Sequence, residues 1–135
     1  MVLRVHDAIY QATDGRLGHR MVGVPTLLLR STGRKSGEIR TNSLTYARAG
    51  EDYLLVASNG GSDKAPAWLH NIRANGQVEI QIGRKRMAAT ASEVNRGEPG
   101  FDEMWANVNE HNHDRYIAYQ RKTTRQIPVV VVTPS

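Results

Sequence analysis

The sequence contains no cysteine among its 135 residues, so neither a disulfide framework nor thiol chemistry is available to this chain. It also has no apolar run near the roughly 20 residues that a membrane-spanning helix requires. The first residues lack the long apolar core of a signal peptide, and we expect no leader there. These absences fit the reducing cytosol. We therefore expect a cytoplasmic protein and leave association with a membrane surface open.

Aromatic residues are scarce, with a single phenylalanine and an aromatic fraction of 6%. Sheets that bind single-stranded nucleic acid stack bases on aromatic side chains that recur along their strands, and no predicted strand carries such a series. His111, His113 and Asp114 match no strong zinc spacing, so no metal is expected. The chain also has no nucleophile elbow around a serine and no Gly-x-Gly-x-x-Gly segment between a strand and a helix. Nucleic-acid binding, triad hydrolysis and Rossmann-type dinucleotide binding are all disfavoured.

The sequence does have an excess of positive charge, with a net charge of +5 and a pI near 9.9. Such a balance indicates an anionic partner, and a nucleic acid, an acidic membrane surface or a polyanionic small molecule each qualifies. With 39% hydrophobic residues, the chain is long enough for a real core and is expected to form one domain, residues 1–135.

A basic, glycine-punctuated loop is the strongest local signal. The segment Thr32-Gly33-Arg34-Lys35-Ser36-Gly37-Glu38-Ile39-Arg40 joins two predicted strands, although a plain hairpin needs only about two to five connecting residues. Glycines permit positive φ, and successive N–H groups in such turns form a concavity that binds anions. Arginine and lysine side chains suit phosphate or carboxylate oxygens. A solvated basic hairpin loop is the alternative.

A second glycine turn, Asn59-Gly60-Gly61, follows an apolar strand predicted over residues 53–58. Adjacent glycines at a strand end allow a ligand to approach the backbone closely, and a plain flexible turn is the alternative. Pro66 suits the first position of a helix that includes Trp68, and the N-terminus of such a helix favours negative charge. We expect the basic loop, this turn and this helix to converge on one phosphorylated ligand.

The remaining periodicities give the order of elements. A helical segment is expected within residues 1–13, and the chain is predicted to continue as three strands, a helix, two strands, a helix pair and a strand. The predicted strands cover residues 26–31, 40–48, 53–58, 78–82, 87–94 and 127–132. Strands in the middle and helices at the edges indicate an α+β antiparallel barrel or sheet, not a doubly wound fold.

Several of these motifs, taken together, resemble the deazaflavin-dependent nitroreductase family. They are the Thr32–Gly37 segment, Arg40-Thr41-Asn42, Ala57–Gly61, Pro66-Ala67-Trp68 and Tyr116-Ile117-Ala118-Tyr119-Gln120, and the similarity runs from about Asp14 to Pro134. The resemblance implies a split β-barrel of mostly antiparallel strands with flanking helices. It also implies coenzyme F420, an 8-hydroxy-5-deazaflavin with a phosphate and an oligoglutamate tail. Members transfer hydride from the reduced coenzyme to quinones, nitroaromatics and activated alkenes such as enones.

The family pattern also implies roles for individual residues. The coenzyme phosphate and glutamates would meet Arg34, Lys35 and Arg40, in a groove that is also lined by Ser36, Gly37, Thr41 and Asn42. The deazaflavin and its ribityl phosphate would be flanked by Ala57, Ser58, Asn59, Gly60, Gly61, Lys64, Ala65, Pro66, Ala67, Trp68 and Asn71. The substrate side, with the catalytic candidates, would be bordered by Ser58, His113, Tyr116 and Tyr119. Tyr116 is either a hydroxyl donor to the acceptor oxygen or an apolar wall.

Two departures from the pattern matter. Asn59 stands where relatives often carry lysine, which predicts a weaker phosphate contact, and His113 stands where well-known nitroreductases carry tyrosine. Two other functions stay open. One is a non-catalytic F420 or fatty-acid binding protein of the same fold, and the other is a basic module for nucleic acid or an anionic membrane. The sequence does not predict the oligomeric state or the natural acceptor.

Overall fold

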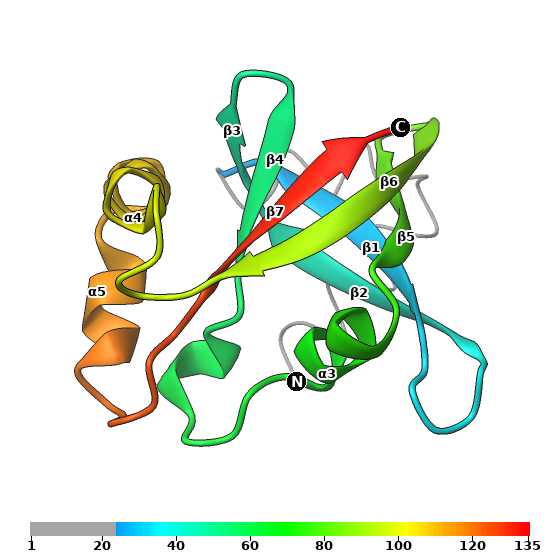
Figure 1. Cartoon of the computed structure of the whole chain (residues 1–135). Helices are drawn as coiled ribbons and strands as arrows, with labels where there is room; N and C mark the ends of the chain where they lie inside the picture. Colours follow the sequence, from blue (N-terminus) through cyan, green and yellow to red (C-terminus); the bar gives the residue numbers. More distant parts are fainter. Residues whose placement is uncertain (1–23) are drawn as a thin grey trace.

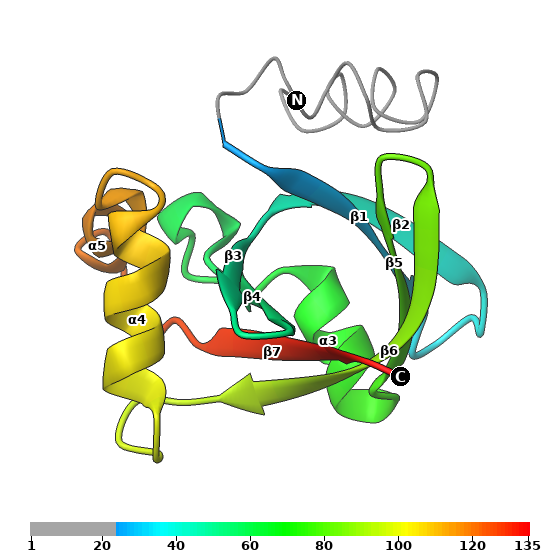
Figure 2. The same cartoon turned by 90° about the horizontal axis from the view of Figure 1, so that it is seen from above.

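The computed structural model describes residues 24–135, so the helical segment expected within residues 1–13 lies outside the described part. The described chain forms one sheet in the order β2-β1-β5-β6-β7-β4-β3, and every neighbouring pair is antiparallel. The strands are β1 (Thr26–Thr32), β2 (Ile39–Thr45), β3 (Ala47–Ala49), β4 (Asp52–Val56), β5 (Gln77–Ile82), β6 (Lys85–Val94) and β7 (Val129–Pro134). Figure 1 shows them from the side and Figure 2 from above.

Tyr46 is the residue that closes this sheet. The strands β2 and β3 lie at opposite edges of the strand order, yet only Tyr46 separates them along the chain. A flat seven-stranded sheet cannot bring its two edges within one residue of each other, so the sheet must curl into a barrel, as Figure 2 shows. The sequence predicted one continuous strand over residues 40–48. That prediction was wrong at Tyr46, because alternation of side chains does not reveal a change of strand partner.

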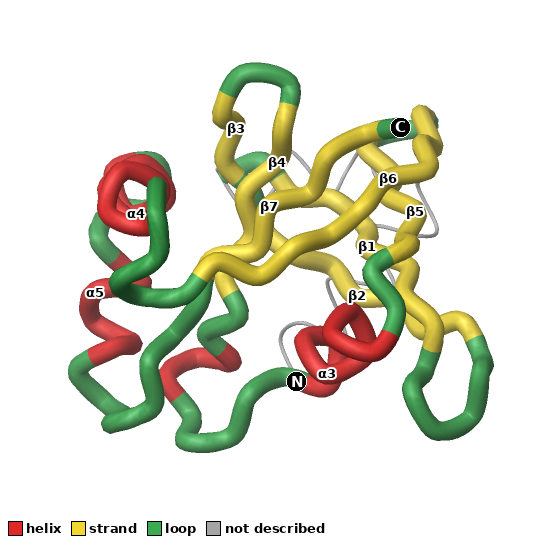
Figure 3. Tube along the Cα trace, in the orientation of Figure 1, coloured by secondary structure: helices red, strands yellow, loops and turns green. Residues whose placement is uncertain are grey.

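Within residues 24–135, three helices and one short turn accompany the sheet; Figure 3 colours them red. They are α3 (Ala67–Ala74), α4 (Phe101–Glu110), α5 (Arg115–Gln120) and the 3₁₀ turn η1 (Asn59–Gly61). Helix α3 contacts β1 and β6, whereas α4 lies against β3, β4 and β7, and α5 contacts α4 and η1. None of the helices in residues 24–135 is long and apolar enough to cross a membrane.

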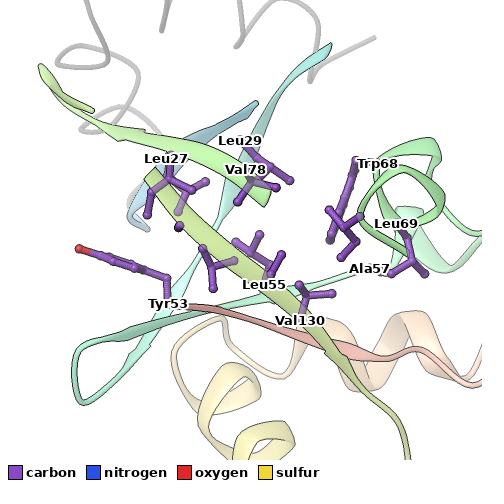
Figure 4. Close-up of a cluster of buried hydrophobic side chains, with 14 residues drawn as sticks. Leu27, Leu29, Tyr53, Leu55, Ala57, Trp68, Leu69, Val78 and Val130 are labelled. Atoms are coloured by element: carbon purple, nitrogen blue, oxygen red, sulfur yellow. The ribbon is translucent and has the colours of Figure 1, made fainter. Parts of the chain in front are cut away.

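The core has two parts that share strand β4. Leu55 faces the barrel interior with Leu29 and with Trp68 of α3, as Figure 4 shows. Leu54 faces the opposite side and packs under α4 and α5. Burying each such leucine stabilises the fold by about 1.5–3 kcal/mol. The prediction that this strand is buried on both faces is confirmed for residues 53–56, all of which are buried.

Candidate active site

The basic loop between β1 and β2 is internally ordered by its own hydrogen bonds. The Gly33 N–H donates to the Glu38 carbonyl at 2.7 Å, and the Gly37 N–H donates to the Gly33 carbonyl at 2.8 Å. The Glu38 N–H donates to Ser36 Oγ at 3.1 Å. Gly37 has a φ of +76°, a conformation that disfavours any residue with a Cβ. The loop therefore presents its cations from a compact turn.

A buried asparagine on α3 holds this loop against the helix. The Arg34 N–H donates to Asn71 Oδ1 at 3.0 Å, and Asn71 Nδ2 lies 3.5 Å from Ser31 Oγ. Asn71 is only 5% exposed, so this amide is a fixed anchor. As a result, the loop and the first turns of α3 face each other across a groove.

The groove between the loop and α3 has a volume of about 510 Å³. The strand register places Arg40 opposite Ser31 and Asn42 opposite Leu29, so these side chains share the interior face of the sheet. Within residues 24–135, the guanidinium of Arg34 and the ammonium of Lys35 have no ion-pair or hydrogen-bond partner, and Arg40 lies 3.6 Å from a Glu38 carboxylate oxygen. The lining is Gly33, Arg34, Lys35, Ser36, Ile39, Arg40, Thr41, Asn42, Ala67, Trp68 and Asn71.

The glycine turn at the end of β4 is tightly bent. Ser58 has helical backbone angles (φ −82°, ψ −32°), and it is followed by three residues of positive φ, namely Asn59 (46°), Gly60 (65°) and Gly61 (86°). A Cβ added at Gly61 would lie 2.7 Å from the Tyr119 carbonyl oxygen of α5. Glycine is therefore required at position 61 for close packing as well as for its φ.

We expect Gly61→Ala to destabilise the protein by about 2–5 kcal/mol, because an unfavourable φ and overpacking against α5 both contribute. Gly60→Ala is the matched control, because residue 60 also has positive φ but nothing lies within 4 Å of an added Cβ. The control should cost only about 1–2 kcal/mol. Chemical denaturation of both variants measures the difference, and equal losses would contradict the close packing of η1 on α5.

Arg125, in the connection between α5 and β7, is a residue of this region that the sequence did not single out. Its guanidinium donates to the carbonyls of Ala57 at 3.1 Å, Ser58 at 3.0 Å and Ser62 at 3.1 Å. Desolvation lowers the pKa of this arginine, with repulsion from Arg73 adding to the effect. No sequence signal reveals it, because one arginine before an apolar strand reads as surface charge.

The remaining members of the predicted cofactor set lie between η1 and α3. The Lys64 carbonyl accepts a hydrogen bond from Asn59 Nδ2 at 3.0 Å, which ties the two ends of the turn together. Pro66 is the N-cap of α3 rather than its first residue, so the helix begins at Ala67, one position after the predicted start. Ala65 packs against the interior core. Gly37 lies at the loop tip, next to the groove-lining residues. The structure thus places the set in two adjoining parts, the groove and the β4–α3 turn.

The four catalytic candidates do not all lie together. Ser58 is buried in the turn, and the Tyr119 backbone packs on the neighbouring Gly61. Tyr116 is 6% exposed, its hydroxyl lies 2.7 Å from Thr45 Oγ1, and its burial raises the pKa of the phenol. A cavity lined by Thr45 and Tyr116 has a volume of about 10 Å³, the space of roughly one water molecule. Their catalytic roles stay predictions.

His113 lies elsewhere. It is exposed, has a φ of 55°, and lines an open groove of about 670 Å³ on the outer side of α4 and α5, beside Trp105 and Ile117. The basic groove and this outer groove share no lining residue. A role for His113 on the substrate side would need the acceptor to approach from α5.

Comparison with known proteins decides the family. The sequence profile described as F420H(2)-dependent quinone reductase matches residues 2–134. The chain belongs to this family. An F420H(2)-dependent quinone reductase of Mycobacterium tuberculosis is 53% identical over 133 residues, which cover 98% of this chain and 89% of the relative. The expected relationship to F420-dependent reductases is therefore confirmed, and the matching family is described as quinone reductases.

Solved structures of related proteins have the same fold as this member of the F420H(2)-dependent quinone reductase family. An F420-H2 dependent reductase, FDR-A, is 38% identical and superposes with a TM-score of 0.70 over 80% of this chain and 93% of that chain. A chain described as a domain-swapped dimer is 35% identical, with a TM-score of 0.73 over 96% of this chain and 93% of that one. The predicted split β-barrel of antiparallel strands with flanking helices is confirmed.

Proposed function

We propose that this protein is a reductase that transfers hydride from reduced coenzyme F420 to a quinone. The observation that carries the proposal is the groove in which Arg34, Lys35 and Arg40 converge, in a chain that belongs to the F420H(2)-dependent quinone reductase family. Cations gathered in a groove match a ligand that carries several negative charges. A carrier that binds F420 without turnover is the alternative, and a turnover assay separates the two.

The residues present fit the coenzyme. Its phosphate and glutamate oxygens need charged donors, and two of the three groove cations have no anionic partner within residues 24–135. Helix α3 also favours an anion in the groove. Its first turn has no acidic residue, and its N-cap, Pro66, makes no side-chain hydrogen bond. The free N–H groups and positive dipole end of the helix then favour an anion beside Ala67 and Trp68, which line the groove.

When bound, the reduced coenzyme supplies the hydride. The residues of this chain then have three tasks, which are to fix the coenzyme, to place the acceptor against it and to exclude water. Trp68 is 4% exposed and forms a rigid wall between the groove and the core. The basic loop, anchored on Asn71, fixes the anionic end of the coenzyme.

Negative charge develops on an acceptor oxygen as hydride arrives, and a fixed donor stabilises it. We propose Ser58 as such a donor, since it sits in the turn next to α5. In the hydrogen bond between Tyr116 and Thr45 either hydroxyl can be the donor, so Tyr116 keeps a proton for an acceptor oxygen only where Thr45 donates. Tyr119, whose ring meets that of Tyr116 edge-on at 6.3 Å, and His113 are proposed to border the acceptor. Nitroaromatics and enones are further acceptors that we propose on the same chemical grounds.

Peripheral contact with an anionic membrane is a further part of the proposal. Ile39 is 63% exposed and lies at the loop end of β2, beside the cations of the groove. An exposed apolar side chain next to basic residues suits a surface of anionic headgroups, near which lipid-soluble quinones reside. Sedimentation with anionic vesicles, comparing Ile39→Ser with the unchanged protein, tests this contact.

The protein should bind F420 more tightly than FMN, because FMN lacks the glutamate tail that the basic loop is proposed to hold. Ionic contacts of exposed groups weaken with salt, so the affinity for F420 should fall as salt is added, and the preference over FMN should shrink with it. Fluorescence titration with both cofactors at two salt concentrations measures this. Equal affinities at moderate salt would contradict the assignment, and oxidation of reduced F420 by menadione tests turnover.

A further inference from the structure

We propose that Arg125 is a positioning residue for the reductase reaction. It holds the turn of residues 57–62 by three carbonyl groups, so that the N–H groups of Ser58 and Asn59 form a donor pair for a ligand oxygen that carries negative charge. The identity of the ligand rests on the proposed function. The positioning itself rests on contacts within the chain.

The Arg125 guanidinium donates to three carbonyl oxygens of the turn. Nη1 donates to the Ala57 carbonyl at 3.1 Å, and Nη2 donates to the Ser58 carbonyl at 3.0 Å and the Ser62 carbonyl at 3.1 Å. Nε donates a further bond to the same Ser62 oxygen at 3.3 Å. A planar fork with fixed donors on three nitrogens suits three carbonyls at once, whereas the three donors of a lysine ammonium share one nitrogen on a flexible stem.

The position of Arg125 is itself fixed by neighbouring bonds. Gln120 Nε2 donates to the Arg125 carbonyl at 2.7 Å, and the Arg125 N–H donates to Thr123 Oγ1 at 3.1 Å. The Thr123 hydroxyl donates to Asp63 Oδ1 at 2.6 Å, which adds a second tie between this connection and the turn. The connection between α5 and β7 is therefore ordered by its own hydrogen bonds, and it contacts the turn of residues 57–62 and the adjoining Asp63 through both Arg125 and Thr123.

The direction of the N–H groups follows from the direction of the carbonyls. In a trans peptide the C=O and the N–H point in opposite directions, and residues 24–135 contain no cis peptide. Because the Ala57 and Ser58 carbonyls point at Arg125, the N–H groups of Ser58 and Asn59 point away from it. No hydrogen-bond acceptor for these two N–H groups lies among the described residues.

The backbone conformation of this pair is one that binds anions. Ser58 has right-handed helical angles, and Asn59 follows with a φ of 46°. Successive N–H groups in such a right-handed to left-handed pair form a concavity suited to an anionic oxygen. Ser58 is 8% exposed, so an unused N–H there is costly unless a ligand accepts it. Two ligand oxygens could accept hydrogen bonds from this pair of N–H groups. One is a carbonyl oxygen of the deazaflavin ring, and the other is the quinone oxygen that becomes negative during hydride transfer.

Arg125→Lys tests the proposal, with Arg121→Lys as the matched control, since Arg121 is exposed and outside the site. In the cofactor-free protein, amide exchange is measured at Gly61 and Ser62, whose N–H groups donate to the Ser58 and Asn59 carbonyls. Arg125→Lys should raise both exchange rates roughly tenfold or more, because the turn loses charge-assisted hydrogen bonds. Amides of the barrel strands and the control variant should stay at wild-type rates.

Ligand measurements with F420 and menadione then identify the oxygen that the donor pair serves. If the donor pair binds the coenzyme, Arg125→Lys should raise the dissociation constant for F420 roughly tenfold or more. If it serves the quinone oxygen, F420 affinity should hold and the single-turnover rate should fall by that factor. Either result supports the proposal.

Unchanged exchange in Arg125→Lys would overturn the bracing role. Faster exchange, with F420 affinity and single-turnover rate both within twofold of wild type, would overturn the positioning role. If the unchanged protein binds no F420, the proposed function fails, and the positioning role fails with it. The exchange result in the cofactor-free protein would still show whether Arg125 braces the turn.

Discussion

Reversing two charges of the basic groove, Lys35→Glu together with Arg40→Glu, is expected to abolish measurable F420 binding. Each cation is proposed to make a charge-assisted contact worth about 1.5–3 kcal/mol, and glutamate replaces attraction by repulsion. Loss of two such contacts corresponds to roughly 10²–10⁴-fold in the dissociation constant. Both side chains are exposed, so the melting temperature should change little. Fluorescence titration with F420 and thermal denaturation, run side by side, check both expectations.

The matched control is Lys85→Glu together with Arg86→Glu, at the start of β6. Both residues are exposed, and the double change lowers the net charge from +5 by the same four units, since each substitution removes two. The register pairs Leu28 of β1 with Gln81 near the β5–β6 turn, whereas Thr32 pairs with Ile39 at the basic loop. The two turns thus lie toward opposite ends of β1. Equal weakening by both double variants would mean that overall charge, not the groove, attracts the coenzyme.

The groove was largely predictable from the sequence because its signals are local. Gly33 and Gly37 mark the turn, and the cations that line the groove lie within a few residues of them. The helix starting near Pro66 was also predictable, since proline and the apolar spacing that follows it act over one or two turns. Only the hydrogen bond that holds the loop against α3, from the Arg34 N–H to Asn71, depends on a contact between distant parts of the chain.

The parts that the sequence did not predict depend on long-range partners. Tyr46 separates two strands that pair with different neighbours, and strand propensity carries no information about partner choice. Arg125 contacts carbonyls more than 60 positions earlier in the chain, and nothing in its own neighbourhood marks it. The i, i+3 spacing of Tyr116 and Tyr119 did indicate a helix, but it could not show that Thr45 would meet the Tyr116 hydroxyl.

Trp68→Ala is expected to have the largest effect on stability, a loss of about 3–5 kcal/mol, because it empties the space of a large ring at the end of the barrel core. That is a large share of the 5–15 kcal/mol typical of a folded domain. The same ring lines the basic groove, so F420 affinity should fall as well, even where the variant is still folded. Denaturant unfolding and F420 titration at low temperature measure the two effects separately.

The second tryptophan provides the control for this last prediction. Trp105 is half-buried on α4, stacks on Phe101 with ring centroids 5.7 Å apart, and lines the outer groove rather than the basic one. Trp105→Ala should cost less, about 1–2 kcal/mol, and leave F420 affinity unchanged. Trp68→Phe should recover most of the stability, since an aromatic ring still fills the core. If Trp68→Ala lost stability but bound F420 normally, Trp68 would be a core residue alone, and the coenzyme would occupy the groove without touching its inner wall.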